Sequence, residues 1–199
     1  MMDKQGFTPQ LRGTLFSALT GRGGDVSGRS DADVHGMLLA IGGPANTKSG
    51  INLTAVAAEL GVSRRTAERW VTNASQKIRL RGANLSKVVA KSRQAATTKA
   101  GRRRAMAAAR AGSRTRYGSK LSVTGQQGPL RSGTAYRRRR KITLDLTPEA
   151  TEEMLTAYED GGDKGYMAWL EGYASENYLD DWGFDSITDV AVDDPRSGL

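Results

Sequence analysis

The sequence predicts a mainly α-helical chain with an N-terminal helix-turn-helix, a long basic helical arm and a small C-terminal β-α-α-β unit. Three observations lead to this prediction: residues 53–72 have helix-turn-helix spacing, residues 69–144 contain no acidic side chain, and residues 141–146 alternate between apolar and polar. The expected boundaries are 1–73 for the helical N-terminal region, 74–141 for the arm with a Gly-rich connector, 142–194 for the β-α-α-β unit and 195–199 for a tail.

The composition excludes several kinds of site. The 199 residues include no cysteine, so disulfides and cysteine-based metal centres are excluded. The single histidine, His35, cannot build a multi-histidine metal centre, and such a lone histidine is more often a surface or packing residue than a general base. We expect no metal site in this chain.

The longest apolar run near the N-terminus is too short to span a bilayer. The sequence also lacks the flanks of a cleaved signal. We therefore expect a cytoplasmic, nucleoid-associated protein with no membrane partner. A net charge of +9 and a pI near 10.0 favour a polyanionic partner.

Two short helices are predicted before the helix-turn-helix. Residues 7–21 combine Thr8 as N-cap, Pro9 at the first helical position and Gly21 as a stop signal. Residues 31–43 form a second helix that begins at an aspartate and ends at two glycines. The segments that follow these helices, 21–28 and 43–50, are predicted loops.

Residues 53–72 match a helix-turn-helix. Ala57 lies where two helices cross closely, Gly61 takes the turn, and Ser63 caps the second helix. The predicted buried positions are Val56, Leu60, Val62, Ala67 and Trp70. The predicted outward face, which would enter a DNA major groove, comprises Ser63, Arg64, Arg65, Thr66, Glu68 and Arg69. The alternative is an ordinary helical hairpin with one basic face.

Charge is divided into blocks along the chain. Residues 1–68 carry seven basic and six acidic side chains, for a net charge of +1. Residues 69–144 carry 21 basic and no acidic side chains, and residues 145–199 carry two basic and 15 acidic ones, for −13. Ordinary surfaces mix both signs, so either phosphate or the acidic C-terminal part must neutralise the middle block. One hypothesis is that the acidic unit covers the basic arm until DNA displaces it.

The basic block is predicted to form a DNA-binding arm. Helices are expected from Ser86 to about Ala100 and from Arg102 to Ala111, but their apolar faces are too thin for either helix to be stable alone. We expect the arm to track phosphates; a solvated basic helix is the alternative. A Gly-rich connector is expected at 121–135. The candidate DNA contacts within the rest of the basic block are Lys77, Arg79, Arg81, Arg102, Arg103, Arg104, Arg114, Arg116, Tyr117, Arg137 and Arg138.

Residues 142–194 are predicted to form the β-α-α-β unit. A strand at 141–146 is followed by a helix from Pro148 to Tyr158, a second helix from Asp163, and a strand at 186–194. Its strand-helix-helix opening is also similar to a ribbon-helix-helix protomer, which needs a second copy to build its sheet. A homodimer is therefore one possible assembly.

The ordered set of motifs resembles the telomere-protecting terminal proteins of linear bacterial replicons. The resemblance covers residues 53–194 and comprises ELGVSRRTAERW, a basic Ala/Arg helix, SRTRYG, a Gly-rich connector, RRRRKITLDLTPE, EGYASENYLDDWG and SITDVAVD. It implies a protein that binds telomeric DNA, becomes attached to the 5′ end, and offers a side-chain hydroxyl as primer for end-patching by a DNA polymerase. It also implies recruitment by a telomere-associated protein.

The resemblance implies that the linked residue is a threonine before an Arg-aromatic-Gly triplet, here Arg116-Tyr117-Gly118. The aligned position holds Ser113, and Thr115 lies two residues further on, so both hydroxyls are candidates. Tyr117 is a third candidate, or a platform on which a base stacks. Neighbouring arginines would stabilise a transferring phosphoryl group.

No carboxylate in the block can hold magnesium or act as a base, so a partner polymerase would supply both. The chain is thus expected to be a protein primer and nucleotide acceptor rather than an enzyme, with no cofactor of its own. The alternatives are a non-covalent helix-turn-helix regulator or partition factor, and a nucleic-acid enzyme that uses Asp180, Asp181 and Asp185 to hold magnesium.

Overall fold

The computed structural model describes residues 8–29, 33–75, 80, 82–129 and 136–194. This part of the chain is mostly helical (60%), with eight helices and one three-stranded antiparallel sheet. The mainly α class is therefore confirmed. The elements are α1 (Pro9–Thr20), α2 (Val34–Gly42), α3 (Leu53–Leu60), α4 (Arg64–Ser75), α5 (Gly82–Thr97), α6 (Lys99–Arg110), α7 (Ser113–Tyr117), β1 (Ser119–Pro129), β2 (Arg138–Leu146), α8 (Pro148–Asn177) and β3 (Trp182–Asp193).

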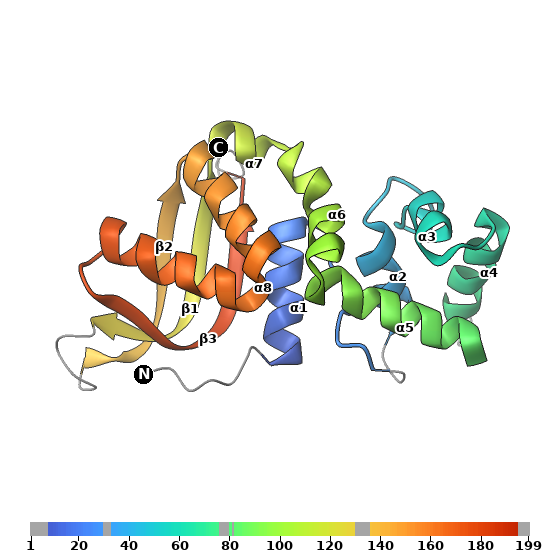
Figure 1. The fold of residues 1–199 in the computed structure, drawn as a ribbon, viewed down its shortest axis with the longest axis horizontal. Helices are drawn as coiled ribbons and strands as arrows, with labels where there is room; N and C mark the ends of the chain where they lie inside the picture. Colours follow the sequence, from blue (N-terminus) through green and yellow to red (C-terminus); the bar gives the residue numbers. More distant parts are fainter. Residues whose placement is uncertain (1–7, 30–32, 76–79, 81, 130–135, 195–199) are drawn as a thin grey trace.

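The elements form two lobes joined by α6 (Figure 1). One lobe, here the sheet lobe, contains the three strands with α8 and α1, so the helix nearest the N-terminus packs with the last part of the chain. The other, here the helical lobe, contains α2 to α5. A small cluster that includes Phe16, Ala40, Ala96 and Ala105 connects α1, α2, α5 and α6 between the lobes.

The two helices of the predicted helix-turn-helix, α3 and α4, are present in the helical lobe. Of the predicted inward residues, Val56, Leu60, Ala67 and Trp70 are buried and pack in one cluster with α2 and Val88 of α5, and Val62 is half-buried against the same cluster. Gly61 has a φ of 62°, a left-handed conformation that glycine adopts without a steric cost.

Side-chain caps begin both helices of this motif. The Asn52 side chain accepts a hydrogen bond from Ala55 N at 3.1 Å, which caps α3. Ser63 Oγ accepts one from Thr66 N, also at 3.1 Å, at the start of α4. The predicted capping role of Ser63 is therefore confirmed, and the local sequence sets where the second helix begins.

The predicted β-α-α-β arrangement is wrong. The sheet order is β2-β1-β3, so a central strand precedes the two strands that the sequence predicted. β1 occupies the first part of the predicted Gly-rich connector, and Leu121 and Val123 face the core. Its Gly125 lies at a register shift where a Cβ would come within 2.0 Å of Ser186 O. This glycine therefore permits a close approach of two strands rather than a loop.

The sheet is complete within one chain. β1 pairs antiparallel with both β2 and β3, with partners such as Val123 opposite Ile142 and opposite Val190. The ribbon-helix-helix expectation, in which a second copy supplies the partner strand, is therefore not needed to build this sheet.

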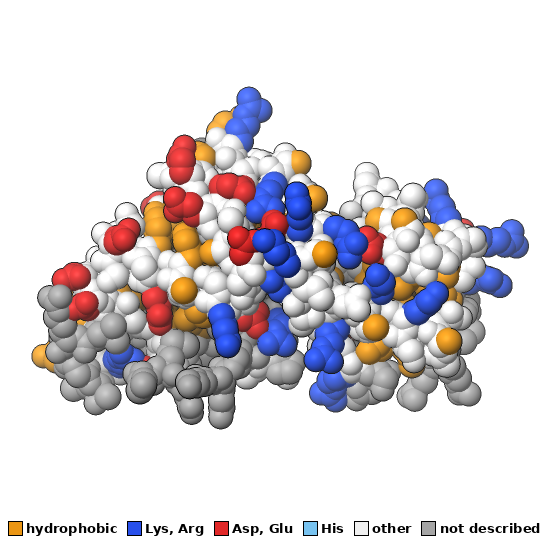
Figure 2. Space-filling view, viewed as in Figure 1, with side chains coloured by type: hydrophobic (Ala, Val, Ile, Leu, Met, Phe, Trp, Pro, Cys, Tyr) orange, Lys and Arg blue, Asp and Glu red, His pale blue; other side chains and the backbone are white. Residues whose placement is uncertain are grey.

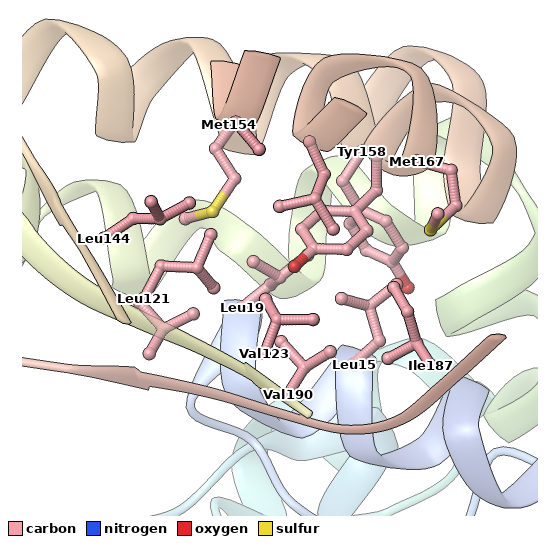
Figure 3. Close-up of a cluster of buried hydrophobic side chains, with 14 of the residues drawn as sticks. Leu15, Leu19, Leu121, Val123, Leu144, Met154, Tyr158, Met167, Ile187 and Val190 are labelled. Carbon is pink, nitrogen blue, oxygen red and sulfur yellow. The ribbon is translucent and has the colours of Figure 1, made fainter. Parts of the chain in front are cut away.

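The two helices predicted after Thr147 are the halves of α8. Thr147 caps the first half, because its Oγ1 accepts a hydrogen bond from Ala150 N at 3.2 Å. The halves join at Gly162, whose φ of 60° and ψ of −141° interrupt the helix. Side chains of α8, α1 and one face of the sheet meet in the core of the sheet lobe, where Tyr158, Leu15 and Val190 point toward one another (Figure 3).

The two helices predicted in the basic arm are α5 and α6, and both pack into the fold. α5 and α6 contribute buried residues to the cores, including Val88, Ala96 and Met106. Because their apolar faces are thin, as predicted, they are stabilised by packing: α5 packs against α2, and α6 packs against α8. None of the described helices is long and apolar enough to cross a membrane.

Candidate nucleic-acid interface

The outward face of the helix-turn-helix is accessible. Arg64, Arg65 and Arg69 are exposed on α4, and Arg64 Nε donates a hydrogen bond to Glu68 Oε1 at 3.0 Å. Thr66 is half-buried at the first turn, where its hydroxyl lies 2.9 Å from Ser63 Oγ. An exposed pair such as Arg64 with Glu68 is readily exchanged for a phosphate or a base edge.

A cavity of about 740 Å³ adjoins this face, between the loop after α2 and helix α4. It is lined by Thr47, Lys48 and Ser49 from the loop and by Arg64 and Glu68 from α4. Lys48 is exposed, and sequence reasoning missed it as a candidate contact. Its signal was a lysine in the polar loop just before the motif, because lysine side chains are common phosphate contacts in DNA-binding proteins.

The arginines of α6 are largely engaged by the protein itself. Arg102 is only 6% exposed, and its guanidinium donates to Glu159 O at 3.0 Å and to Ala96 O at 3.3 Å. It is a structural residue, so the prediction that it contacts DNA is wrong. Arg103 and Arg104 are exposed, as expected for DNA contacts, but they lie 3.9 Å from Glu159 and 3.2 Å from Glu59.

Acidic side chains of α8 lie against α6. Lys99 pairs with Asp160 at 2.8 Å, and Arg110 pairs with both Glu152 and Glu159. Burial alone would lower the pKa of Arg110, but hydrogen bonds and charge from the two glutamates raise its pKa above the ordinary value. Figure 2 shows acidic side chains over the sheet lobe and basic ones over the centre and the helical lobe. The acidic part thus neutralises some of the block, at residues that help hold the fold together.

The short helix α7 carries both candidate hydroxyls. Thr115 Oγ1 donates to Arg110 O at 2.7 Å and lies 3.2 Å from Gly112 O, so its proton is held by the chain's own backbone. Ser113 is half-buried, and its Oγ donates to the carboxylate of Asp194 just after β3. The prediction that no carboxylate lies nearby is therefore wrong. Residues 69–144 contain no carboxylate, but the fold brings Asp194 to Ser113 from 81 residues away.

Three other residues of α7 differ in exposure. Arg114 is half-buried and donates to Ala18 O at 2.8 Å, which anchors its guanidinium. Arg116 is exposed and lies 5.3 Å from the centre of the Tyr117 ring. Tyr117 is 42% exposed, so its ring offers a face on which a base can stack.

Ser113 also lines a cavity of about 410 Å³. One wall comes from the end of α6 and the start of α7, and the opposite wall from the loop after α1 and the start of α3. Arg22 and Arg114 line the same cavity. The fold therefore brings Ser113, Arg22, Arg114 and the start of α3 to one cavity, and Asp194 contacts the Ser113 hydroxyl.

Arg22 was also missed by sequence reasoning. Its Nη1 donates to Ile41 O at 2.7 Å and its Nη2 to Arg104 O at 2.9 Å, so it ties the loop after α1 to α2 and α6. Burial lowers the pKa of Arg22, Glu59 opposes this effect, and Arg104 adds to it. Nothing in the sequence pattern distinguishes Arg22 from any loop arginine.

The remaining predicted contacts are divided. Arg138 is exposed at the start of β2, whereas the Arg137 side chain is 13% exposed and forms an ion pair with Asp185. Arg137 therefore supports the fold, and Asp185 is engaged by it rather than grouped for a metal. Within the described ranges there is no group of three or more His, Asp or Glu side chains placed to hold a metal ion. Lys77, Arg79 and Arg81 lie outside the described residues.

His35 has a packing environment. It is half-buried, and its Nε2 lies within hydrogen-bond distance, 3.2 Å, of Ser49 O. This contact joins the start of α2 to the loop beside the larger cavity.

Comparisons with protein-family models, with curated proteins and with solved structures found no match to this chain.

Proposed function

We propose that this chain is a DNA-binding terminal protein: it binds DNA ends through its helix-turn-helix and offers the Ser113 hydroxyl as the attachment point for a 5′ nucleotide. One observation carries this proposal. The Ser113 hydroxyl donates to Asp194 and borders a cavity whose opposite wall includes the start of α3, the first helix of the motif. In helix-turn-helix proteins this helix crosses the DNA backbone, so a bound strand would pass close to the hydroxyl.

The chemistry at Ser113 is a phosphoryl-transfer step. Ser113 Oγ attacks the α-phosphorus of a nucleoside triphosphate, an Oγ–P bond forms, and the bond between the α-phosphorus and the pyrophosphate oxygen breaks. The hydroxyl proton moves to the carboxylate of Asp194, and pyrophosphate leaves. The guanidinium of Arg114 offers positive charge to the phosphoryl oxygens. The nucleotide on Ser113 then provides the 3′-hydroxyl from which synthesis continues.

Ser113 is favoured over Thr115 within this proposal. Thr115 donates its proton to backbone carbonyl oxygens, which accept a hydrogen bond but do not act as bases. A nucleophilic hydroxyl needs an adjacent group that can take its proton, and the Asp194 carboxylate meets this requirement at Ser113.

The partners belong to the same proposal. Magnesium would be held by a DNA polymerase that extends the primer, and a telomere-associated protein would bring the chain to the DNA end. The chain would need no cofactor of its own.

The proposal is tested with two matched variants, Ser113→Ala and Thr115→Val, expressed beside the wild type in cells that carry a linear replicon. Each protein is purified under denaturing conditions and digested with nuclease, and the nucleotide-bearing fraction is measured. Ser113→Ala should lose the adduct, and Thr115→Val should keep it. An adduct that survives in Ser113→Ala would contradict the assignment.

A non-covalent regulator or partition factor is the second candidate. It is favoured by the helical lobe, which has its own core and presents an exposed basic helix without any contribution from α7. This function predicts a footprint on internal duplex sites with no preference for ends. A wild-type protein that shows such a footprint and carries no adduct would support it.

A further inference from the structure

We infer that the 410 Å³ cavity beside Ser113 is a binding site for the nucleotide that this hydroxyl accepts, a deoxynucleoside triphosphate. The inference rests on the proposed function and adds a substrate site within this chain. A protein primer of this kind would hold its first nucleotide itself rather than depend entirely on the polymerase.

The size and the walls of the cavity suit a nucleoside. Its volume lies within the range of ~300–1,000 Å³ that small-molecule sites commonly have. The space exists because the elements that surround it carry small side chains there. These small or apolar residues are Gly42, Gly43, Pro44, Ala55, Ala108 and Ala109. They offer a base and a sugar apolar contact without filling the cavity.

Arginines at the rim suit the phosphates. The Arg114 guanidinium is anchored by its bond to Ala18 O, and its other N–H groups make no hydrogen bond to a described residue. Arg22 is held by three backbone carbonyl oxygens, yet its buried Nε–H has no partner among the described residues. A Cβ at Gly43 would lie 3.4 Å from this Nε, so the glycine leaves room for the Arg22 side chain beside the cavity. The fixed Arg114 guanidinium favours phosphate oxygens, and Arg22 adds a positive charge beside the cavity.

The nucleophile is placed to use a nucleotide bound there. Ser113 lines the cavity, and its Oγ donates a hydrogen bond to Asp194. With the triphosphate at the arginines, the α-phosphate adjoins the hydroxyl, and pyrophosphate leaves as the Oγ–P bond forms. A 5′-terminal phosphate on a DNA strand presents the same chemistry to the arginines, so the experiment must distinguish the two sources.

The test measures binding of each of the four deoxynucleoside triphosphates to the full chain by calorimetry, without polymerase. Ala108→Phe places a ring in the cavity from an exposed position of α6. Ala107→Phe is the matched control, because Ala107 is also exposed on α6 but does not line the cavity. Ala108→Phe should weaken binding at least tenfold, and Ala107→Phe should leave it within twofold of the wild type. Equal affinities for the two variants would overturn the inference.

A second pair keeps the test independent of the folding of Ala108→Phe. Arg114→Gln should weaken triphosphate binding, whereas Arg93→Gln, an exposed arginine of α5 away from the cavity, should not. A 5′-phosphorylated oligonucleotide that binds in this Arg114-dependent way, while the triphosphates do not, would overturn the assignment of the free nucleotide.

The inference and the proposed function fail separately. If Ser113 carries an adduct but Ala108→Phe does not weaken triphosphate binding, the inference is wrong and the proposed function still holds. If Ala108→Phe weakens triphosphate binding but the protein never carries an adduct, the cavity binds a nucleotide and the proposed function is wrong.

Discussion

Replacing Arg102 with methionine tests whether the basic helix α6 is part of the fold or a DNA-binding arm. The guanidinium is buried and makes three hydrogen bonds to backbone oxygens: to Glu159 O at 3.0 Å, and to Ala96 O and Asp160 O at 3.3 Å each. It also lies beside the kink of α8, where a Cβ on Gly162 would be 3.1 Å from Arg102 Nη1. The bonds to Glu159 O and Asp160 O reach backbone carbonyl groups just before the Gly162 interruption of α8.

The expected loss of stability follows from these contacts. Each buried carbonyl left without a donor costs about 1–3 kcal/mol of stability. Methionine carries no charge, so the cost of burying the guanidinium disappears and offsets part of this loss. We expect Arg102→Met to lower the free energy of unfolding by about 2–4 kcal/mol. For a chain of this size that corresponds to a fall in Tm of roughly 5–12 °C.

The assay is urea unfolding followed by circular dichroism, with DNA affinity measured on the same samples. Arg103→Met is the matched control, since the Arg103 side chain is 76% exposed and its nearest carboxylate oxygen is 3.9 Å away. The control should change stability by no more than about 0.5 kcal/mol. If Arg102→Met were as stable as the control but bound DNA more weakly, Arg102 would be a DNA contact and the packing described here would be wrong.

Three further predictions concern the interface, the nucleophile and the acidic helix. Asp194→Asn should lower the rate of adduct formation about a hundredfold, because an amide cannot take the hydroxyl proton; single-turnover labelling measures this, and an unchanged rate would exclude Asp194 as the base. Arg65→Ala and Arg69→Ala should each weaken duplex binding about tenfold in a fluorescence anisotropy titration, and unchanged affinity for both would exclude α4 as the DNA-reading helix. Lys99 lowers the pKa of Asp160 in the folded protein below its ordinary value of 3.8. The Lys99–Asp160 ion pair therefore stabilises the fold above that value, and this stabilisation is lost as the pH falls through the lower pKa of the folded protein. Asp160→Asn should therefore reduce the loss of stability on acidification from about pH 5 to about pH 3, as followed by thermal melts, and a variant with the wild-type pH profile would contradict this pairing.

Local signals in the sequence predicted α1 and the α3–α4 pair well. The helix-turn-helix was predictable because its caps, turn glycine and inward positions all lie within one short segment. The same holds for α1, whose N-cap Thr8, first-turn Pro9 and stop Gly21 occur where the sequence indicated. Such signals depend on neighbours in the chain, so they can be read without knowledge of the fold.

The sheet and the candidate site depend on contacts between distant segments. β1 was missed because its Gly125 and Gly128 resemble loop residues, and only the approach of β3 explains the glycine at position 125. Asp194 and Arg22 are distant in sequence from Ser113, yet the first is bonded to it and the second lines the same cavity. The charge pattern correctly indicated a cationic block, but it does not distinguish Arg102, which holds α8, from arginines that face solvent.

The central claim, that Ser113 is the nucleotide acceptor, is tested most directly by locating the linkage on the protein. Cleavage after Arg110, Arg114 and Arg116 places Ser113 and Thr115 on separate peptides, AGSR and TR. Mass spectrometry of nuclease-digested protein from cells with a linear replicon should find a nucleotide monophosphate on AGSR, with TR unmodified. Full recovery of both peptides without a nucleotide, or a nucleotide on TR alone, would contradict the claim.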